Sequence, residues 1–317
     1  MISGVKRKNN DESSVLCKKK EVARQRWKIL AETLNGKGSS ETQQSAVSVR
    51  RFQSYGLLDT HKVEGPVTEG SDATWYQYTC PTLPHLTMKI RHVKETIRAQ
   101  DLLGFNNTGN VCVWPSEEVM AYYCLQHIDD FRASNIIELG GGMTCLTGVA
   151  LAVSADAHQI VLTDGNEQSV SNLQEIIQEN NSGNAAVSAR LLRWGPDPVD
   201  EDLQGTFDCV LCADCLFFDE GREHLITTIY SLLKPGGQAL VFAPRRNGTF
   251  DTFCDLAKEK LVTQRCEQHD GHVWSLHSEL KASSEAYSED LHFPLLVKLT
   301  KQRGQDADSR DTTPESR

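Results

Sequence analysis

Three cysteines and one aspartate lie in the segment CVLCADCLFF, residues 209–218. Cys209, Cys212 and Cys215 follow a C-x-x-C-x-x-C spacing that could bind a metal ion, and Asp214 lies in the last gap. In an extended strand, side chains three positions apart point to opposite faces, so Cys209 and Cys212 could not converge on one metal. The apolar neighbours indicate a buried strand in which cysteine acts as a small hydrophobic residue. We therefore expect no metal here, and we expect chemistry from Asp214 at the strand's carboxyl end.

A run of three glycines, Gly140 to Gly142, follows the short apolar segment NIIEL and opens an apolar helical pattern. Because glycine has no Cβ atom, the backbone of such a turn can approach a ligand closely. The segment lacks the third glycine of the G-x-G-x-x-G pattern. The turn could therefore bind a ligand, or it could be a plain connection between strand and helix.

Two carboxylates flank this turn. Glu138 comes just before the glycines, and Asp164 ends the next expected strand in VLTD, where an acidic side chain commonly meets the hydroxyls of a ribose. Carboxylates attract a cationic group and repel a pyrophosphate, so S-adenosylmethionine fits better than NAD. Two structural alternatives remain: Asp164 could cap the following helix, and Glu138 could be a charge at a strand end.

The elements that position these residues alternate between strand and helix from Asn135 onward, which is typical of a parallel sheet with crossover helices. We expect a Rossmann-like, mostly parallel sheet of seven strands with helices on both faces. The expected strands are NIIEL, HQIVLTD, AVSARLLRW, TFDCVLCADCLFF, QALVFAPR, and a closing pair near HVWSLH and LHFPLLVKLT.

The region before this sheet has a different character. Ala23, Trp27, Leu30 and Leu34 follow the spacing of one helical face among lysines and arginines, which predicts a basic amphipathic helix over residues 18–34. Short alternating and aromatic segments then predict a β-rich part over about residues 47–95. A strand ending at Trp114 and a helix capped by Ser116 follow.

Charge and composition limit the partners. The net charge of −10 argues against nucleic acid as the main partner. Residues 1–40 carry ten Lys and Arg against four Asp and Glu, so a basic arm precedes an acidic body. No apolar run is long enough to span a bilayer, and we see no signal peptide. We expect a monomer in the cytoplasm, with the nucleus as a second location, and ten cysteines that are free thiols.

An ordered set of motifs resembles a known family. ELGGG, TDGN, RWG and FDCVLCADCLFF resemble, in order and spacing, the motifs of the class I seven-stranded methyltransferases. VWPS, and the D-x-x-F of Asp214 to Phe217, look like methyltransferase family 16, the branch that modifies protein lysines. The resemblance covers roughly residues 20–300. It implies S-adenosylmethionine as the cofactor and a protein lysine, of calmodulin or of another protein, as the substrate. The alternative is a non-catalytic module that retains the cofactor pocket.

The resemblance also implies which residues hold the cofactor. Trp114 and Trp194 would flank it, the glycine turn would accommodate its methionine part, Asp164 would meet the ribose, and Ala213 would lie under it by its backbone. Each tryptophan could instead be core packing. The full expected set is Trp114, Glu138, Gly140, Gly141, Gly142, Asp164, Asn166, Trp194 and Ala213.

The lysine entrance would be shaped by Asp214 and Phe217. Phe217 stands where the family usually has tyrosine, which puts any role of a tyrosine hydroxyl in doubt. Methyl transfer needs a neutral amine, and a carboxylate favours the ammonium form, so we expect Asp214 to position the substrate and not to act as a strong base. The basic helix either packs against the domain or grips an acidic protein substrate; calmodulin would fit.

These inferences divide the chain into parts. The expected parts are a disordered tail over residues 1–17, the basic helix and β-rich segment over 18–113, a S-adenosylmethionine-dependent methyltransferase domain over 114–300, and a disordered tail over 301–317.

Overall fold

A computed structural model of the 317-residue chain describes residues 52–66, 73–93, 112–180, 183–219 and 221–303. The expected basic helix over residues 18–34 lies outside these ranges, as do the first expected tail and most of the second. Within the described part of the chain, no helix is long and apolar enough to cross a membrane.

A seven-stranded sheet forms the centre of the protein, in the order β6-β5-β4-β7-β8-β10-β9. The first five strands in this order are parallel, and β10 runs antiparallel to both β8 and β9. Its strands are β4 (Asn135–Leu139), β5 (Gln159–Asp164), β6 (Ala186–Leu191), β7 (Phe207–Ala213), β8 (Leu233–Pro244), β9 (Val262–Cys266) and β10 (Pro294–Thr300). The predicted fold class is confirmed.

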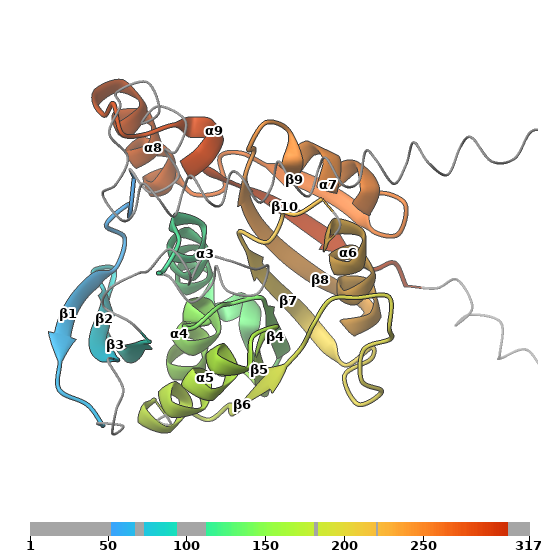
Figure 1. Ribbon diagram of the computed structural model, residues 1–317, viewed down its shortest axis with the longest axis horizontal. Helices are drawn as coiled ribbons and strands as arrows, with labels where there is room; N and C mark the ends of the chain where they lie inside the picture. Colours follow the sequence, from blue (N-terminus) through green and yellow to red (C-terminus); the bar gives the residue numbers. More distant parts are fainter. Residues whose placement is uncertain (1–51, 67–72, 94–111, 181–182, 220, 304–317) are drawn as a thin grey trace, which may run out of the picture.

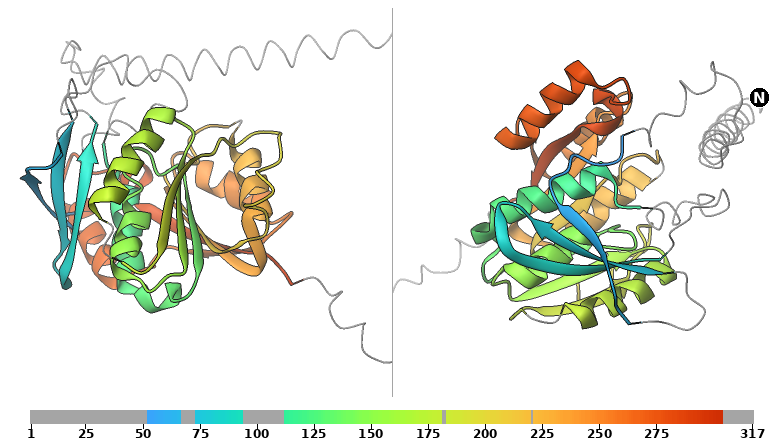
Figure 2. Two further views of the ribbon diagram at one scale, coloured as in Figure 1. Left: turned by 90° about the horizontal axis from the view of Figure 1, so that it is seen from below. Right: turned by 90° about the vertical axis from the view of Figure 1, so that its left-hand side faces the viewer.

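Helices cover both faces of this sheet (Figures 1 and 2). α3, α4 and α5 lie on one face, and α6 and α7 lie on the other, as crossover connections between parallel strands require. The helices are α3 (Pro115–Gln126), α4 (Leu146–Ser154), α5 (Glu167–Glu179), α6 (Gly221–Leu232), α7 (Thr249–Ala257), α8 (Gly271–Ser283) and α9 (Glu289–His292), and a 3-10 turn, η3 (Ile128–Phe131), follows α3.

A second, antiparallel sheet packs on the outer side of α4 and α5 (Figure 2). It consists of β1 (Asp59–Val63), β2 (Thr74–Cys80) and β3 (Leu83–His92), in agreement with the predicted β-rich part. Two asparagines of α5 and its cap attach it: Nδ2 of Asn172 donates to the carbonyl of Arg91 at 2.8 Å, and Nδ2 of Asn180 donates to that of Lys89 at 2.7 Å.

The polypeptide changes direction in the sheet between β4 and β7. From β4 the chain proceeds outward through β5 to β6, and then returns to place β7 on the other side of β4. In parallel α/β sheets, ligands bind outside the carboxyl ends of the strands at such a switch point. Glu138 and the glycine turn at the end of β4 therefore lie beside Ala213 and Asp214 at the end of β7.

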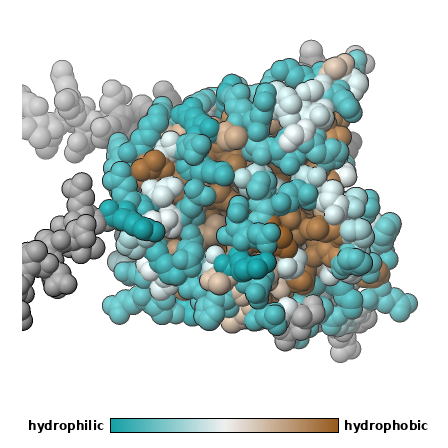
Figure 3. Space-filling view, turned by 180° about the vertical axis from the view of Figure 1, so that it is seen from behind, coloured by the Kyte–Doolittle hydropathy of each residue, from teal (hydrophilic) through white to brown (hydrophobic). Residues whose placement is uncertain are grey.

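Apolar side chains from both sheet faces make one core, in which Phe207, Phe242, Phe250 and Phe253 are almost completely buried. On the face opposite to the view of Figure 1, hydrophobic residues show in small areas between hydrophilic ones (Figure 3). Within the described residues, the large hydrophobic side chains that stay exposed are Leu191, Tyr230 and Val262, which belong to three separate elements.

Three local predictions were wrong. HVWSLH, expected as a strand, lies in α8, because the Asp270 carboxylate accepts hydrogen bonds from the backbone of His272 and Val273 and caps a helix there. The seventh strand is the polar edge strand β9 instead. α3 begins at Pro115 with Trp114 as its N-cap, so Ser116 lies inside the first turn. Residues 112–114, the described part of the strand expected to end at Trp114, form no strand.

Candidate active site

The cysteine-rich segment forms the buried strand β7, as predicted. Cys212 is fully buried, and the Cys215 thiol, just beyond the strand, donates to the carbonyl of Ala213 at 3.2 Å. Among the residues that the structure describes, no three His, Cys, Asp or Glu side chains are grouped so that they could hold a metal ion. The thiols therefore pack the strand that carries Asp214.

The glycine turn after β4 can contain only glycine at its first position. Gly140 has a φ of +61°, and a Cβ atom there would lie 2.8 Å from the ring of Trp194 and 2.9 Å from Sγ of Cys215. At Gly141, a Cβ atom would lie 2.9 Å from Cα of Cys145. Trp194 therefore packs directly on the turn, where it was expected to flank the cofactor. Because the turn consists of glycines, no side chain of the turn itself covers its backbone.

Glu138 is completely buried beneath this turn. Its Oε2 accepts a hydrogen bond from the backbone N–H of Gly148 at 2.6 Å, at the amino end of α4. Its Oε1 is buried and accepts no hydrogen bond from the described residues. Burial, with the neighbouring Glu117 as a second cause, raises the pKa of Glu138 to about 8. The side chain is thus an acceptor with one oxygen still available for a cationic or N–H group.

Glu117 is a site residue that the sequence reasoning missed. Its carboxylate reaches the amino end of α4, where it accepts hydrogen bonds from the Thr144 hydroxyl and from the backbone N–H of Leu146 at 3.2 Å. Burial raises its pKa to about 7. A signal was present: two adjacent glutamates, Glu117 and Glu118, begin a helix that is otherwise apolar on all sides.

Asp164, at the end of β5, connects the glycine turn to the next helix. Its two oxygens accept hydrogen bonds at 2.9 Å from the backbone N–H groups of Gly142 and Asn166. The capping role proposed for Asp164 as the structural alternative belongs to Asn166, whose Oδ1 accepts from the backbone of Gln168 and Ser169. Asp164 is therefore held at the crevice edge by the turn itself.

Asp214 begins the loop after β7 in a left-handed conformation with a φ of +55°. Its Oδ2 accepts a hydrogen bond from the Arg246 guanidinium at 2.8 Å, while its Oδ1 is buried and accepts none from the described residues. The rings of Phe217 and Phe218 lie 4.5 Å apart in the same loop, and the guanidinium lies 5.8 Å from the Phe217 centroid. Arg246 follows β8, and the sequence reasoning did not select it.

A small cavity lies between the glycine turn with its glutamates and the loop that begins at Asp214. It has a volume of about 20 Å³, which is close to the size of one water molecule or one ammonium group. Its walls come from the ends of β4 and β7 and from the start of α3. They are formed by Trp114, Glu117, Glu138, Gly140, Gly141, Gly142, Ala213 and Asp214.

The chemistry of this wall fits S-adenosylmethionine. The cofactor carries an ammonium and a sulfonium, and the cavity wall contains the buried carboxyl groups of Glu117, Glu138 and Asp214. Within the described residues, only Asp214 among these three forms an ion pair with a basic side chain, Arg246. The unbonded Oε1 of Glu138 would accept an ammonium N–H. Glu138 and the glycine turn would hold the methionine part, and Asp164 the ribose.

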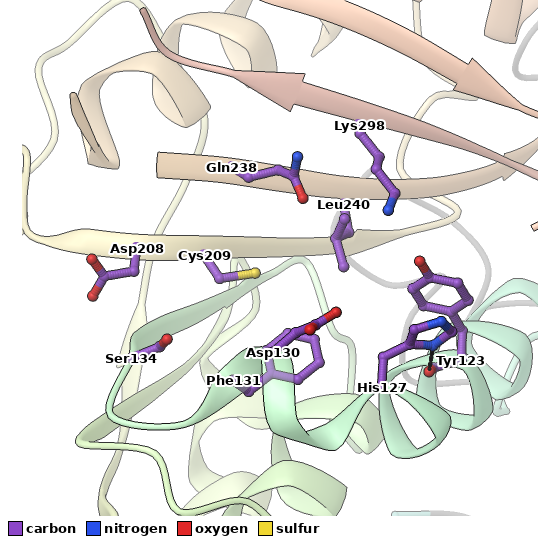
Figure 4. A pocket seen from close by; sticks show the side chains of 10 residues that line it. All are labelled: Tyr123, His127, Asp130, Phe131, Ser134, Asp208, Cys209, Gln238, Leu240 and Lys298. Carbon is purple, nitrogen blue, oxygen red and sulfur yellow. Dashed lines mark hydrogen bonds between the residues drawn. The ribbon is translucent and has the colours of Figure 1, made fainter. Parts of the chain in front are cut away.

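A larger cavity of about 170 Å³ lies at the other end of the sheet (Figure 4). Among its lining residues, Ser134 lies directly before β4 and Asp208 lies at the amino end of β7. Ligands of such sheets bind at the carboxyl ends, and the Asp208 carboxylate already accepts from Lys234 at 2.7 Å. The larger volume therefore does not mark the reaction site.

The chain is similar to known proteins over most of its length. The model of a lysine methyltransferase family matches residues 95–260. Calmodulin-lysine N-methyltransferase of Arabidopsis thaliana is 32% identical over 299 residues, which cover 87% of this chain and 96% of that protein.

Solved structures are more distant. A methyltransferase from Pyrococcus furiosus is 13% identical over 57% of this chain and 80% of its own, with a TM-score of 0.41. A TehB-like S-adenosylmethionine-dependent methyltransferase from Corynebacterium glutamicum is 17% identical over 58% of this chain and 87% of its own, also with a TM-score of 0.41. The assignment does not depend on these two. On the family match and the relative from Arabidopsis, the chain belongs to the S-adenosylmethionine-dependent lysine methyltransferases.

Proposed function

We propose that the chain methylates a lysine of calmodulin. The observation that carries this proposal is its similarity to the Arabidopsis calmodulin-lysine N-methyltransferase, which extends over 96% of that protein and so includes the parts before and after the family match. A second support is the charge distribution, because a basic segment within residues 1–40 would attract an acidic protein.

On the cofactor side, the proposed binding residues are those of the sequence prediction, with Glu117 added. Glu138 and the glycine turn would hold the methionine part, Asp164 the ribose, and Trp114 and Trp194 the two flanks. Ala213 would contact the cofactor by its backbone, and Asn166 would act through its cap on α5. Bound S-adenosylmethionine would supply a methyl group on a positively charged sulfur.

On the substrate side, Asp214 and Phe217 would receive the lysine. Near neutral pH only about one lysine amine in 10³ is uncharged, a deficit of about 4 kcal/mol, so the entrance has to favour the neutral form. The adjacent rings of Phe217 and Phe218 would do so by excluding water from the amine. Alignment of nitrogen, methyl and sulfur would supply most of the acceleration.

Further parts of the proposal concern the whole chain. Residues 114–300 would form the catalytic domain, residues 18–113 would add the second sheet and the basic helix, and residues 1–17 and 301–317 would be tails. A monomer in the cytoplasm, with the nucleus as a second location, stays a prediction, as does activity without a metal ion.

The test is methyl transfer from radiolabelled S-adenosylmethionine. The purified full chain is incubated with unmethylated calmodulin and, separately, with a lysate poor in methylation, and the labelled residue is identified by mass spectrometry. We expect label on a calmodulin lysine in both reactions. Label confined to another protein of the lysate would replace calmodulin by that substrate, and cofactor binding without any labelled protein would contradict the enzymatic proposal.

A further inference from the structure

The guanidinium of Arg246 lies beside the two residues that are proposed to receive the substrate lysine. Its Nη2 donates to Oδ2 of Asp214 at 2.8 Å, and its centre lies 5.8 Å from the ring of Phe217. The two charged side chains are only 17% and 10% exposed. A cation thus already contacts the carboxylate and one of the rings that are proposed to receive the lysine.

The backbone directs Arg246 into this place. Arg246 and Asn247, after β8, have φ values of +42° and +54°, and Asp214 opposite them has +55°. Left-handed conformations cost non-glycine residues about 1–3 kcal/mol each and persist where the surroundings fix them. α9 fixes the conformations of Arg246 and Asn247. The carbonyl of Asp290 accepts from Arg246 N–H at 2.8 Å, and the Asp290 carboxylate accepts from Asn247 N–H.

Arg246 is not needed to hold the Asp214 loop in position. The N–H of Asp214 donates to the carbonyl of Phe242 at 2.8 Å. Farther along the loop, the buried Arg222 of α6 donates to the carbonyl of Leu216 at 2.9 Å and to the carboxylate of Asp219 at 2.6 Å. The contact between Arg246 and Asp214 therefore matters chiefly for the electrostatic environment of the lysine entrance.

That environment affects the charge of the substrate amine. A lone carboxylate beside a lysine favours the ammonium, which cannot react, whereas a nearby cation favours the neutral amine. Burial raises the pKa of Asp214, and Arg246 opposes that rise. Burial is the larger cause, so the pKa of Asp214 stays raised. The guanidinium therefore favours the ionised, hydrogen-bond-accepting carboxylate and offsets its negative charge.

Other charged groups around the pair are directed elsewhere. Asp290 is bonded to the backbone of Asn247, and the neighbouring Arg245 pairs with Glu267 at 3.0 Å and with Asp251 at 3.6 Å. Asp164, across the crevice, accepts from the backbone at its own turn. Among the described residues, the Asp214 carboxylate forms an ion pair with Arg246 alone.

One hydrogen-bond acceptor is left over for the substrate. Oδ1 of Asp214 is buried and accepts no hydrogen bond from the described residues. Buried carboxylate oxygens are rarely left without a donor, so this oxygen is available to an N–H that arrives with the substrate. An uncharged lysine amine has two N–H groups and keeps its lone pair for the methyl group.

We propose that Arg246 is a positioning residue for methyl transfer: it occupies one oxygen of Asp214, leaves the other to accept an N–H of the lysine, and by its charge favours the neutral amine. The inference rests on the proposed role of Asp214 at the lysine entrance. It implies that Arg246 stays in place during the reaction and that the lysine does not displace it.

The test is the pH dependence of kcat and KM, measured separately from pH 6.5 to 9.5 with S-adenosylmethionine and unmethylated calmodulin or, if the lysate identifies another substrate, that protein. Arg246→Gln removes the charge but keeps an N–H donor, and Arg246→Lys restores the charge. Arg245→Gln is the matched control, because it changes the adjacent arginine, which is half exposed and pairs away from Asp214. Cofactor affinity by calorimetry shows whether each variant is folded.

The rate rises with pH as the bound amine loses its proton, so loss of a nearby positive charge must move the midpoint to higher pH. We expect Arg246→Gln to raise the midpoint of kcat by about one pH unit or more, with roughly tenfold lower activity at pH 7 that largely returns above pH 9. Arg246→Lys should restore most of the shift, and Arg245→Gln should follow the original chain.

Two results would overturn the role of Arg246. Superimposable pH profiles, or a loss that is uniform across pH, would make the contact structural. Higher activity with a lower KM in Arg246→Gln would make Arg246 a plug that the lysine displaces. If the unaltered chain binds cofactor but labels no lysine, the proposed function itself fails, which is a distinct outcome.

Discussion

The two sides of the reaction crevice treat buried carboxylates in opposite ways. On the cofactor side, Glu117, Glu138 and Asp164 accept hydrogen bonds from backbone N–H groups and from the hydroxyls of Thr144 and Ser169. No basic side chain among the described residues is bonded to them. On the substrate side, Asp214 is paired with Arg246 at 2.8 Å.

The difference corresponds to the charge that each side would receive. Burial raises the pKa values of Glu117 and Glu138, and in Glu138 repulsion by Glu117 adds to the rise. An incoming sulfonium and ammonium would favour the ionised carboxylates. A carboxylate that is already paired with a cation can still accept a hydrogen bond, but it has little preference for a charged donor over a neutral one. The cofactor side is thus built for cations, and the substrate side for an amine that has to be uncharged.

The largest effect is expected from the substrate side. Asp214→Ala removes the acceptor for the lysine and should lower kcat/KM by at least about 100-fold, which corresponds to about 2.7 kcal/mol of transition-state stabilisation. The affinity for S-adenosylmethionine should change little. Both are measured with the labelled-cofactor assay and by calorimetry.

Because Asp214→Ala also leaves Arg246 buried without its partner, Asp214→Asn serves as the matched variant of nearly equal shape. Its activity should also fall strongly, since the amide weakens the acceptor and leaves the guanidinium uncompensated. An active Asp214→Ala variant would locate the lysine entrance elsewhere.

A smaller effect is expected from the cofactor side. In the unaltered chain, affinity for S-adenosylmethionine should rise from pH 6.5 to 8.5, because Glu138, with a pKa raised to about 8, must lose its proton to attract a cation. Glu138→Gln should weaken binding by about tenfold at pH 8.5 and flatten this rise. Calorimetric titration at the two pH values measures it.

Glu118→Gln is the control, because the Glu118 carboxylate accepts from the backbone of Tyr55 and Leu57, at 2.8 Å each, outside the cofactor cavity. An equal pH dependence in Glu138→Gln and in the unaltered chain would remove Glu138 from cofactor binding.

The same carboxyl group should affect stability with a defined sign. Its folded pKa of about 8 exceeds the ordinary 4.5, so the folded state binds the extra proton between these values, and the free energy of unfolding falls as pH rises through that window. Glu138→Gln should reduce the fall by about 1 kcal/mol or more, as measured by urea unfolding at pH 5.5 and 8. A steeper fall in the variant would contradict the assignment.

The smallest effect is expected beneath the substrate side, at Cys212 of β7. Cys212→Ala removes one buried sulfur and should lower the free energy of unfolding by about 1 kcal/mol, with methyl transfer preserved and insensitive to chelators. Denaturant unfolding and the methyl-transfer assay measure both. Loss of activity together with loss of a bound metal would restore the cysteine-cluster interpretation.

The parallel part of the fold was predictable because it repeats one pattern. Short apolar strands such as NIIEL are buried on both faces, and helices follow β4, β5, β7 and β8, although none follows β6 in the described residues before β7. The closing strands were not predictable in this way: VTQRC is a polar edge strand without an alternating pattern, and HVWSLH is apolar enough for a strand until Asp270 caps it as a helix.

In the site, the residues adjacent to strand ends could be predicted, since topology brings the ends of β4, β5 and β7 together. Glu117 and Arg246 could not, because each reaches the crevice through contacts far away in the sequence. Glu117 depends on how α3 crosses α4, and Arg246 depends on two left-handed residues held by α9.

Asn172 sets a limit on how this sequence can vary. Its amide nitrogen donates to the carbonyls of Arg91 and Met143 at 2.8 and 2.7 Å, and its oxygen accepts from the Arg91 guanidinium at 2.7 Å. Aspartate has the shape but neither donor, and glutamine has the groups but an extra carbon in a position that is 2% exposed. Selection among all twenty amino acids at this position should therefore return asparagine. Because Asn172 bonds both to β3 and to the residue after the glycine turn, substitutions in the second sheet are expected to be accompanied by substitutions near that turn.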